Sequence, residues 1–525
     1  MLSLAQEKAR PPKIADARCE ACHEEIFRKY VTTPMANASG PSAEKFKTGT
    51  YINKSSGISY AFVSKNGQPV LSYQDTRNSQ ISGEWDLDFF LGSGHLGVTY
   101  LYSVNGYLFE SPVAYYTRSQ SMDMKPGLEM VSGMLPSLPM ESSCLRCHMS
   151  AVRETDPGTL NHFSGQPFLH TGITCESCHG DTDRHVASGG KAPVVNPAKL
   201  DAARRDSICI SCHLEGDISV ERAGHSALAY KPGEPISDYL SYFVYKGKDT
   251  TRRGVSEVEQ LNLSMCKRTS GEKLSCISCH DPHYTPTVQE RAGFYRKRCL
   301  TCHNDAAFAT SHHPENPDCT SCHMPANGAG NIPHVAWTDH RIRRTPDNET
   351  IIDLGEGEEL TPIFSPGATK RDTALAYYHA VMEGNLVLLP KAYQMLEDGK
   401  LEYSADREAL TALGILCVQR KDYTQASAVF EQVLKLDPVN LTALSNLGTL
   451  RAKSGDLQGA IPYLNKAFER NEDIVGLATN LSQVQCLTGD PAAARITLQK
   501  TSRYSPGLHN LQQMLAALSL CVGGR

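Results

Sequence analysis

Alternation of apolar and polar residues marks two short segments before residue 120. Residues 58–73 and residues 98–109 are rich in β-branched and aromatic side chains, and Asn66-Gly67 and Asn105-Gly106 lie at their centres. Asn-Gly favours the two-residue turn of a β-hairpin, because both turn positions need positive φ angles. The pattern predicts a small antiparallel β subdomain over about 48–120.

A helical pattern with a period of 34 residues occupies the C-terminal part. Small residues recur in the first helix of each unit, Ala recurs in the second, and Asp lies between the two helices. The recurring positions are Gly414, Gly448 and Ser482, then Ala426, Ala460 and Ala494, then Asp422, Asp456 and Asp490. This pattern resembles the tetratricopeptide repeat and implies stacked pairs of antiparallel helices. We expect three copies over about 407–508, a degenerate copy at 373–406 and a capping helix at 509–523; an ordinary helical bundle is the alternative.

Between the two parts, residues 341–372 are rich in Pro, Gly and charge, which is typical of a linker. The predicted domains are therefore 1–345, a linker at 346–372 and a repeat domain at 373–525.

The N-terminal part carries seven copies of Cys-x-x-Cys-His, numbered here from first to seventh. They are Cys19–Cys22–His23, Cys144–Cys147–His148, Cys175–Cys178–His179, Cys209–Cys212–His213, Cys276–Cys279–His280, Cys299–Cys302–His303 and Cys319–Cys322–His323. This is the attachment pattern of c-type haem, in which two thiols bind the porphyrin and the adjacent His is the proximal iron ligand. The sequence therefore predicts seven haem c groups, each with one iron.

The motif is too frequent to be accidental. With 18 Cys and 19 His in 525 residues, chance predicts roughly 0.02 copies. Zinc sites and disulfides are the alternatives, but neither needs a His directly after each second Cys. Haem c is the preferred interpretation.

Seven porphyrins in about 345 residues would supply much of the hydrophobic core that side chains normally provide. We therefore expect a mainly α fold with much irregular structure: a multihaem cytochrome domain containing the small antiparallel β subdomain, followed by an α-helical tetratricopeptide solenoid. The β subdomain serves either as a scaffold over the first haem or as a docking face or pocket wall.

Each iron also needs a sixth ligand or keeps an open position. Ten histidines of the haem region lie outside the motifs, and eight of them are predicted distal ligands, while His162 and His225 are not assigned. The eight are His95, His170, His185, His283, His312, His313, His334 and His340, with one of the adjacent pair 312–313 expected to bind. His185 and His283 closely follow proximal histidines, so each is expected to bind a neighbouring iron. His95 is within reach of the first haem.

A further resemblance concerns the first motif. The segment from Cys19 to Ala36 resembles the opening of the tetrahaem cytochrome carriers of ammonia oxidation, which have a His where this chain has Met35. Met35 is a candidate ligand; alternatively it only packs, and the first haem is open or bound by another His. Together with Cys-His-Asp-Pro-His283, Cys-His-Met-Pro325 and the helical repeats, the chain is similar to exported multihaem cytochromes fused to tetratricopeptide repeats.

Three functions fit these features. The first is electron transfer through seven haems, with the repeats binding a redox partner protein or another subunit; this makes the chain an electron carrier rather than an enzyme. The second is an oxidoreductase that acts on a small nitrogen or sulfur compound at a five-coordinate haem. The Cys-x-x-Cys-Lys motif of the related nitrite reductases does not occur in the sequence. The third is a homo-oligomeric, haem-lined extracellular filament.

Charge and hydropathy restrict the partners and the location. The formal net charge is −5, without long basic runs, so we expect neither nucleic-acid nor anionic-membrane binding. No run of 18 apolar residues suggests a membrane span. Haem c is attached outside the cytoplasmic membrane, so we expect a periplasmic or extracellular protein, and Ser3-Leu4-Ala5 resembles the end of a signal peptide.

Four cysteines lie outside the motifs. The role of Cys266 is open, and Cys417, Cys486 and Cys521 are expected to be small buried apolar residues.

Overall fold

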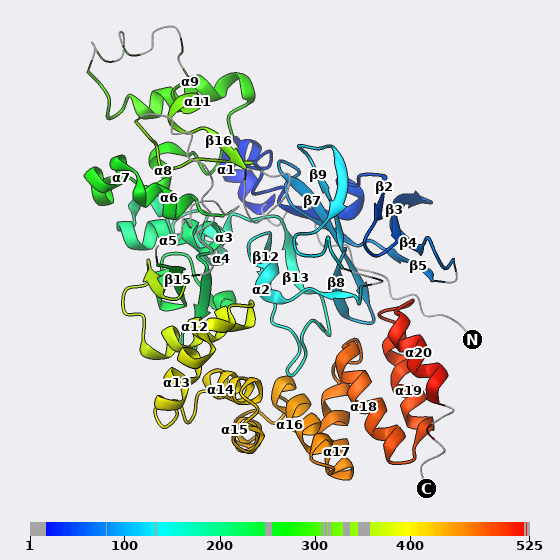
Figure 1. Cartoon of the computed structure of the whole chain (residues 1–525). Helices are drawn as coiled ribbons and strands as arrows, with labels where there is room; N and C mark the ends of the chain where they lie inside the picture. The colour runs from blue at the N-terminus through cyan, green and yellow to red at the C-terminus, as the bar shows by residue number, and fades with distance from the viewer. Residues whose placement is uncertain are drawn as a thin grey trace.

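A computed structural model describes most of the chain (Figure 1). The described residues are 17–79, 81–131, 133, 135–246, 255–305, 308, 312, 316, 318–328, 336–344, 357–518 and 521. His313, His334 and the N-terminal segment with Ser3-Leu4-Ala5 lie outside these ranges. In the described part, no helix combines the length and the apolar composition that crossing a membrane requires.

Both predicted hairpins are present. Asn66-Gly67 joins β3 (Ile58–Lys65) to β4 (Gln68–Asp75), and Asn105-Gly106 joins β7 (Gly97–Val104) to β8 (Tyr107–Glu110). All four turn residues have positive φ, between 51° and 85°, as the hairpin turn requires.

The β region is larger than expected and forms two antiparallel sheets. The four-stranded sheet has the order β2-β3-β4-β5, and the seven-stranded sheet contains the path β1-β6-β7-β8-β11 with β9 and β10 attached through β7. The remaining strands are β1 (Ser39–Pro41), β2 (Gly49–Asn53), β5 (Ser82–Asp86), β6 (Phe89–Leu91), β9 (Val113–Tyr116), β10 (Ser121–Met124) and β11 (Leu138–Pro139). Buried aromatic side chains such as Tyr60, Phe62 and Tyr102 join the sheets into one core.

Short helices make up much of the motif-bearing part, as the sequence predicts, but small antiparallel sheets that it did not predict are also present. The helices are α1 (Ala17–Tyr30), α2 (Ser142–Leu145), α3 (Glu176–His179), α4 (Asp183–Ala187), α5 (Ala202–His213), α6 (Glu257–Leu263), α7 (Met265–Ser270), α8 (Cys276–Cys279), α9 (Val288–Cys299) and α11 (Cys319–His323). The paired strands are β12 (Met149–Val152) with β13 (Phe168–Thr171), β14 (Ile218–Glu221) with β15 (Leu240–Tyr245), and β16 (Ala326–Gly328) with β17 (Ala336–Thr338).

The C-terminal helices form the predicted repeats. The degenerate copy is α12 (Lys370–Met382) and α13 (Leu389–Asp398); the three full copies are α14 (Arg407–Gln419) with α15 (Tyr423–Leu436), α16 (Leu441–Lys453) with α17 (Leu457–Phe468), and α18 (Val475–Leu487) with α19 (Pro491–Ser502); α20 (His509–Ala517) follows. The recurring Asp residues cap the second helix of each copy, since their carboxylates accept backbone N–H bonds at 2.9–3.0 Å. A Cβ at Gly414 would lie 2.5 Å from the Phe430 ring, which explains the small residue there.

The segment predicted as a linker is partly built into the fold. Within it, β18 (Leu360–Ile363) pairs antiparallel with β15, and the backbone N–H of Leu360 donates to the Tyr377 hydroxyl at 3.0 Å. The Pro- and charge-rich composition concealed this strand, because Thr361 and Pro362 are exposed and only Leu360 is buried.

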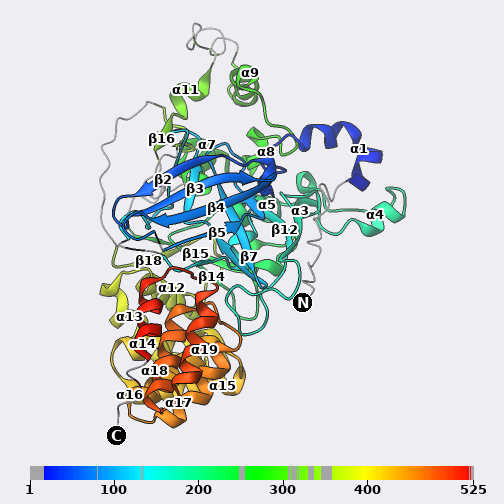
Figure 2. The same cartoon turned by 90° about the vertical axis from the view of Figure 1, so that its right-hand side faces the viewer.

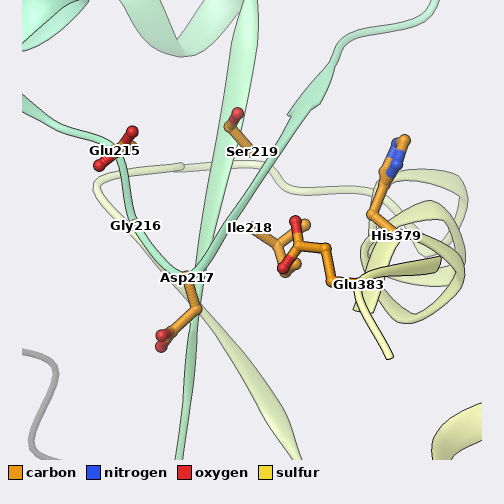
Figure 3. Close-up of a pocket in the computed structure, with 7 residues that line it drawn as sticks. All are labelled: Glu215, Gly216, Asp217, Ile218, Ser219, His379 and Glu383. Carbon is orange, nitrogen blue, oxygen red and sulfur yellow. The ribbon is translucent and has the colours of Figure 1, made fainter. Parts of the chain in front are cut away.

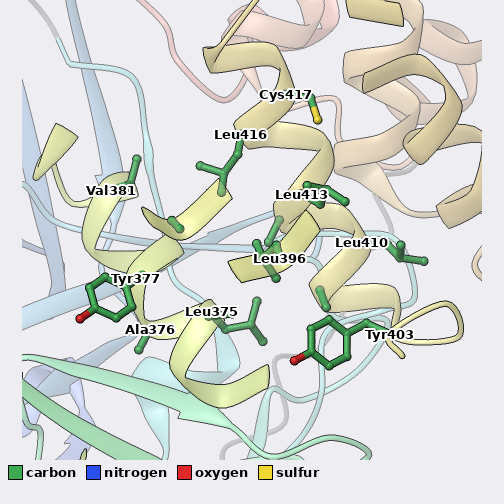
Figure 4. Packing of buried hydrophobic residues seen from close by; sticks show 14 of the residues in the cluster. Leu375, Ala376, Tyr377, Val381, Leu396, Tyr403, Leu410, Leu413, Leu416 and Cys417 are labelled. Carbon is green, nitrogen blue, oxygen red and sulfur yellow. The ribbon is translucent and has the colours of Figure 1, made fainter. Parts of the chain in front are cut away.

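The repeats attach to the rest of the molecule at both of their ends (Figures 1 and 2). At the first end, α12 packs on β14, β15 and β18, and one hydrophobic cluster spans this junction and continues into α16. Figure 4 shows the part of this cluster in α12–α14. At the second end, the Tyr107 hydroxyl donates to the Arg470 carbonyl at 2.9 Å and the Tyr73 hydroxyl to the Pro506 carbonyl at 2.8 Å.

Candidate haem sites

Each motif occupies a helical turn that brings its three functional side chains to one face. In five motifs the second Cys lies inside a helix. In the second and sixth motifs the helix contains only the first Cys. In the third, fifth and sixth motifs the backbone N–H of the His donates to the carbonyl of the first Cys, at 2.9–3.0 Å. Residues three and four apart on a helix share a face, so both thiols and the imidazole point to the same side.

The alternatives to haem find little support in the described part of the chain. None of the fourteen motif cysteines forms a disulfide. The one residue group there that could hold a bare metal ion is the carboxylate cluster of Glu176, Asp181 and Asp183, without any Cys or His. Zinc would need thiolate and imidazole ligands converging on one point.

Four motif histidines face a second histidine across a gap. The ring centres are 6.3 Å apart for His23 and His185, 6.0 Å for His179 and His283, 6.2 Å for His280 and His340, and 6.1 Å for His323 and His312, with interplanar angles of 9–28°. An iron between two imidazoles needs ring centres about 6 Å apart, because each metal–nitrogen bond is roughly 2 Å and each ring centre lies roughly 1 Å behind its nitrogen. Every pair joins one motif His to one of the predicted distal ligands.

Hydrogen bonds orient these rings for metal binding. The Nδ1 atoms of His179 and His185 lie 2.7 and 2.8 Å from the carbonyl oxygens of Val195 and Ala192. Those of His323 and His340 lie 2.6 and 2.8 Å from the carbonyls of Arg343 and Thr338. A carbonyl accepts only a protonated nitrogen, so Nε2 keeps its lone pair, as in most metal-binding histidines.

The seventh motif also lines a cavity. Its walls contain Cys319, Cys322, His323 and the facing His312, together with Arg296. A haem bound there would use both thiols and both imidazoles of this set, and Arg296 would supply a positive charge for a propionate. The side chains thus fit the cofactor in number, type and direction.

Burial keeps several of these imidazoles neutral. It lowers the pKa of His280 to about 4, and the nearby His340 and His213 add to this effect. Burial also lowers the pKa values of His283 and His148. A neutral imidazole is the form that binds iron.

The surroundings of the first motif distinguish the ligand alternatives for the first haem. Its His23 faces His185, so of the alternatives for the first haem, binding by another His fits the geometry better than Met35 or His95. His95 is exposed in the loop between β6 and β7. The Met35 carbonyl accepts the backbone N–H of Ile173 at 3.0 Å, which fixes this segment beside the third motif.

The second, fourth and sixth motifs have other surroundings. His170 lies on β13 opposite Ser150, two residues from His148, and its buried Nδ1 has no hydrogen-bond partner among the described residues. The ring of His303 lies 5.4 Å from that of Phe308.

The two histidines that were not assigned as ligands have other partners. The Nδ1 atom of His162 lies 2.7 Å from the Asp156 carboxylate, and His225 packs edge-on against Tyr239, consistent with leaving both out of the ligand set.

Two cysteines outside the motifs behave differently from the prediction. Cys486 and Cys521 form a disulfide rather than separate buried apolar residues. It joins α18 to the segment after α20, two elements that the sequence period alone does not place side by side. Cys417 is buried as expected, and Cys266 is half-buried near Cys279 and Cys302.

Sequence reasoning missed the ionic contact that holds the first motif to the third. Arg18, next to Cys19, pairs with Glu176 of the third motif and with Asp183 at 2.6 Å. These contacts account for two of the three carboxylates in the acidic cluster. Only the charge of Arg18 beside the motif hinted at such a contact.

A second cavity, of about 360 Å³, lies where the repeats meet the haem region (Figure 3). Glu215 and Asp217, from the segment leading into β14, line it together with His379 of α12 and Glu383, which directly follows that helix. Burial lowers the pKa of His379. The lining is polar and contains no motif residue.

Comparison with known proteins agrees with both parts. Residues 114–180, which include the second and third motifs, match the family model "Cytochrome c554 and c-prime". Residues 408–440 and 441–474 each match a tetratricopeptide repeat model.

One curated relative is the "Multiheme cytochrome MtrA" of Shewanella baltica (strain OS185), which is 26% identical over 178 residues, or 31% of this chain and 52% of that protein. The chain thus spans about half the length of this relative. Among solved structures, YrrB, titled "a TPR protein with an unusual peptide-binding site", is 22% identical and covers 29% of this chain and 78% of its own, with a TM-score of 0.26. MamA 41-end from Desulfovibrio magneticus RS-1 is 20% identical over 29% of this chain and 84% of its own, also with a TM-score of 0.26.

The motifs and the matches together show a multihaem c-type cytochrome fused to tetratricopeptide repeats. The repeats indicate interaction with another protein.

Proposed function

We propose that the chain carries seven covalently bound haem c groups and passes electrons between external redox proteins, with the repeat domain holding a partner protein or a second subunit. The observation that carries this proposal is the set of four imidazole pairs, each separated by the width of an iron and its two bonds. Bis-imidazole iron has no free position for a substrate, so it supplies one-electron chemistry alone.

The chain's own residues fix the cofactors in place. The thiols of each motif would hold a porphyrin, the motif His would bind its iron, and His185, His283, His312 and His340 would supply the second imidazole at four of the irons. Backbone carbonyls hold four of these rings in orientation. For the remaining three irons, Met35, His95, His170, His313 and His334 stay candidate ligands.

Export to the periplasm or the cell exterior belongs to this proposal. Haem c is attached outside the cytoplasmic membrane, and the Cys486–Cys521 disulfide is a bond that persists in oxidising compartments.

The direct test is to produce the full chain in a host that attaches haem c outside the cytoplasm. Mass spectrometry and a haem assay should find seven haems, and electron paramagnetic resonance should show low-spin ferric iron. Replacing His185 with Ala should make one haem high-spin and open it to carbon monoxide, whereas replacing the unassigned His225 with Ala should not. Fewer haems, or no new high-spin iron in the His185→Ala protein, would contradict the proposal.

One observation favours a second candidate, an oxidoreductase at an open haem of the fourth motif. The hydroxyl of Tyr230 is buried without a hydrogen-bond partner among the described residues, and its surroundings include Cys178, Cys209 and Cys212. A buried hydroxyl beside an open iron would donate a hydrogen bond to a bound small molecule. High-spin iron in the unmodified protein that binds carbon monoxide or hydroxylamine, and is perturbed by Tyr230→Phe, would favour this enzyme over the carrier.

A further inference from the structure

Ligand sharing connects the first, third and fifth motifs. His185 follows the third motif's His179 by six residues but faces His23 of the first. His283 follows the fifth motif's His280 by three residues but faces His179 of the third. Each short connection therefore joins two iron sites, in the order first, third, fifth.

Contacts between thiols connect the second and fourth motifs to the fifth. Helix α5 places Cys212 and Cys209 one turn apart, and each reaches a different neighbour. Arg146 of the second motif donates to the Ser211 carbonyl of the fourth, and the Cys147 thiol lies beside that of Cys212. The Cys209 thiol lies beside that of Cys276 of the fifth motif, and Cys178 of the third motif is also near. Because these thiols carry the porphyrin edges, both neighbouring porphyrins would approach that of the fourth motif edge to edge.

The sixth and seventh motifs reach the same place from the other side. Cys299, at the end of α9, lies beside Cys319 of the seventh motif and near Cys279 of the fifth, and Arg296 of the same helix donates to the Cys319 sulfur at 4.0 Å. Cys302 also lies near Cys279. The fifth motif thus has three separate neighbours: the third through His283, the fourth through Cys276 and the sixth through Cys279.

Solvent exposure follows the same arrangement. The four exposed motif cysteines belong to the first, second, sixth and seventh motifs: Cys22, Cys144, Cys302 and Cys322. The cysteines of the third, fourth and fifth motifs are all partly buried. Each of the three end motifs, the first, second and seventh, would therefore have a porphyrin edge near solvent, as would the sixth, while the fifth site would lie inside.

We infer that segment 276–283 is the junction of a branched, not linear, electron path with three two-haem arms: third to first, fourth to second, and sixth to seventh. This inference rests on the proposed function. In each step one electron leaves a ferrous iron, which becomes ferric, and reduces the neighbouring ferric iron; external redox proteins supply and remove the electron at the exposed arm ends. A linear path in sequence order would run from the first motif through the second to the third, yet His185 connects the first motif directly to the third, and the second motif adjoins the fourth.

The experiment follows one electron from the first arm to the seventh motif in the full chain. A ruthenium photosensitiser is attached at Val186→Cys, an exposed position beside His185, in a Cys266→Ser background. His312→Met gives the seventh site a thioether ligand, a higher potential and a distinct absorption band that reports reduction. The light-driven electron should reach this reporter.

Two variants that each lack one haem then test whether the electron path to the seventh site passes through the haem of the fifth motif. Removing the junction haem by Cys276→Ala, Cys279→Ala and His280→Ala should abolish reduction of the reporter. Removing the second haem by Cys144→Ala, Cys147→Ala and His148→Ala should leave it unchanged, because that haem lies on a side arm. Reporter reduction that survives loss of the junction haem, or disappears equally in both proteins, overturns the junction. No reporter reduction in the seven-haem protein would instead contradict the proposed function.

A further variant covers the case in which the junction protein does not fold. His340→Met keeps all seven haems and raises the potential at the junction. With the photosensitiser on the first arm at Val186→Cys, or on the sixth-motif helix at Val288→Cys, the electron should come to rest at the methionine-bound iron. Trapping from one arm alone would overturn the inference.

Discussion

The two parts of this molecule build their interiors from different materials. The repeat helices bury their own side chains: α14 buries seven residues, and α15 and α17 bury four each. Among the motif helices, α3, α8, α9 and α11 have no buried residue. The repeat region thus carries its core in its sequence, whereas the haem region leaves space that the proposed porphyrins would fill.

The largest effect should come from withholding the cofactor. In a host without haem c attachment, we expect the described motif helices to lose stable structure, because nothing replaces the apolar contacts of the porphyrins, while the repeats remain helical. Hydrogen exchange measured by mass spectrometry should show fast exchange in α3, α8 and α11 and protection in α14–α17. Equal protection of the motif helices with and without haem would show that side chains alone stabilise them.

The converse change targets the repeats. Phe430 is fully buried against Gly414, so Phe430→Ala should lower the free energy of unfolding by about 3–5 kcal/mol. Urea unfolding followed by far-ultraviolet circular dichroism measures this loss, while the haem count should not change. Tyr423→Ala, at a partly exposed position of the same helix, is the control and should cost about 0.5 kcal/mol. A similar loss in both variants would mean that the Phe430 contact adds little.

The disulfide should have a somewhat smaller effect. Cys486 and Cys521 are 35 residues apart, and replacing both by Ser should cost about 2–4 kcal/mol through the greater freedom of the unfolded chain. Thermal unfolding of the repeats, with and without a reductant, measures this cost. The reductant should destabilise the natural chain but not the double variant; equal destabilisation of both would argue against the bond.

The smallest effect concerns a carboxyl group between the two parts. Asp473 is buried near Asn161 and His162, and burial raises its pKa to about 6. The folded state therefore holds this proton more tightly than the unfolded chain, so its contribution to stability falls as the pH rises from about 4 to about 6 and then stays constant.

Asp473→Asn keeps the neutral form at every pH. It should match the natural chain near pH 4 and exceed its stability by about 1–3 kcal/mol above pH 6. The measurement is the difference in unfolding free energy between the two proteins as a function of pH. Asp490→Asn, at an exposed helix cap, is the control. A difference in unfolding free energy between Asp473→Asn and the natural chain that does not change with pH would contradict the raised pKa of Asp473.

Features set by neighbouring residues could be predicted from the sequence, whereas contacts between distant segments could not. The hairpins at Asn66-Gly67 and Asn105-Gly106 and the caps at Asp422 and Asp456 are local, since a turn or cap needs only adjacent residues. The 34-residue period similarly fixed the repeats.

The pairing of distant segments left no such local signal. That His185 faces His23, or that Leu360 adds a strand to β15, depends on chain folding between residues more than a hundred positions apart. Short connections did limit the choice, which is why His185 and His283 were expected to serve neighbouring irons.

The attachment of the repeats at both ends affects how they unfold. A free array of helical repeats loosens first at its terminal units, since these have a neighbour on one side only. Here α12 packs on a sheet and the loops before α18 and α20 bond to Tyr107 and Tyr73, so neither end is without a neighbour. Fraying should therefore be suppressed at both extremities, and in the haem-loaded protein the array should melt in one cooperative transition together with the β strands that anchor it.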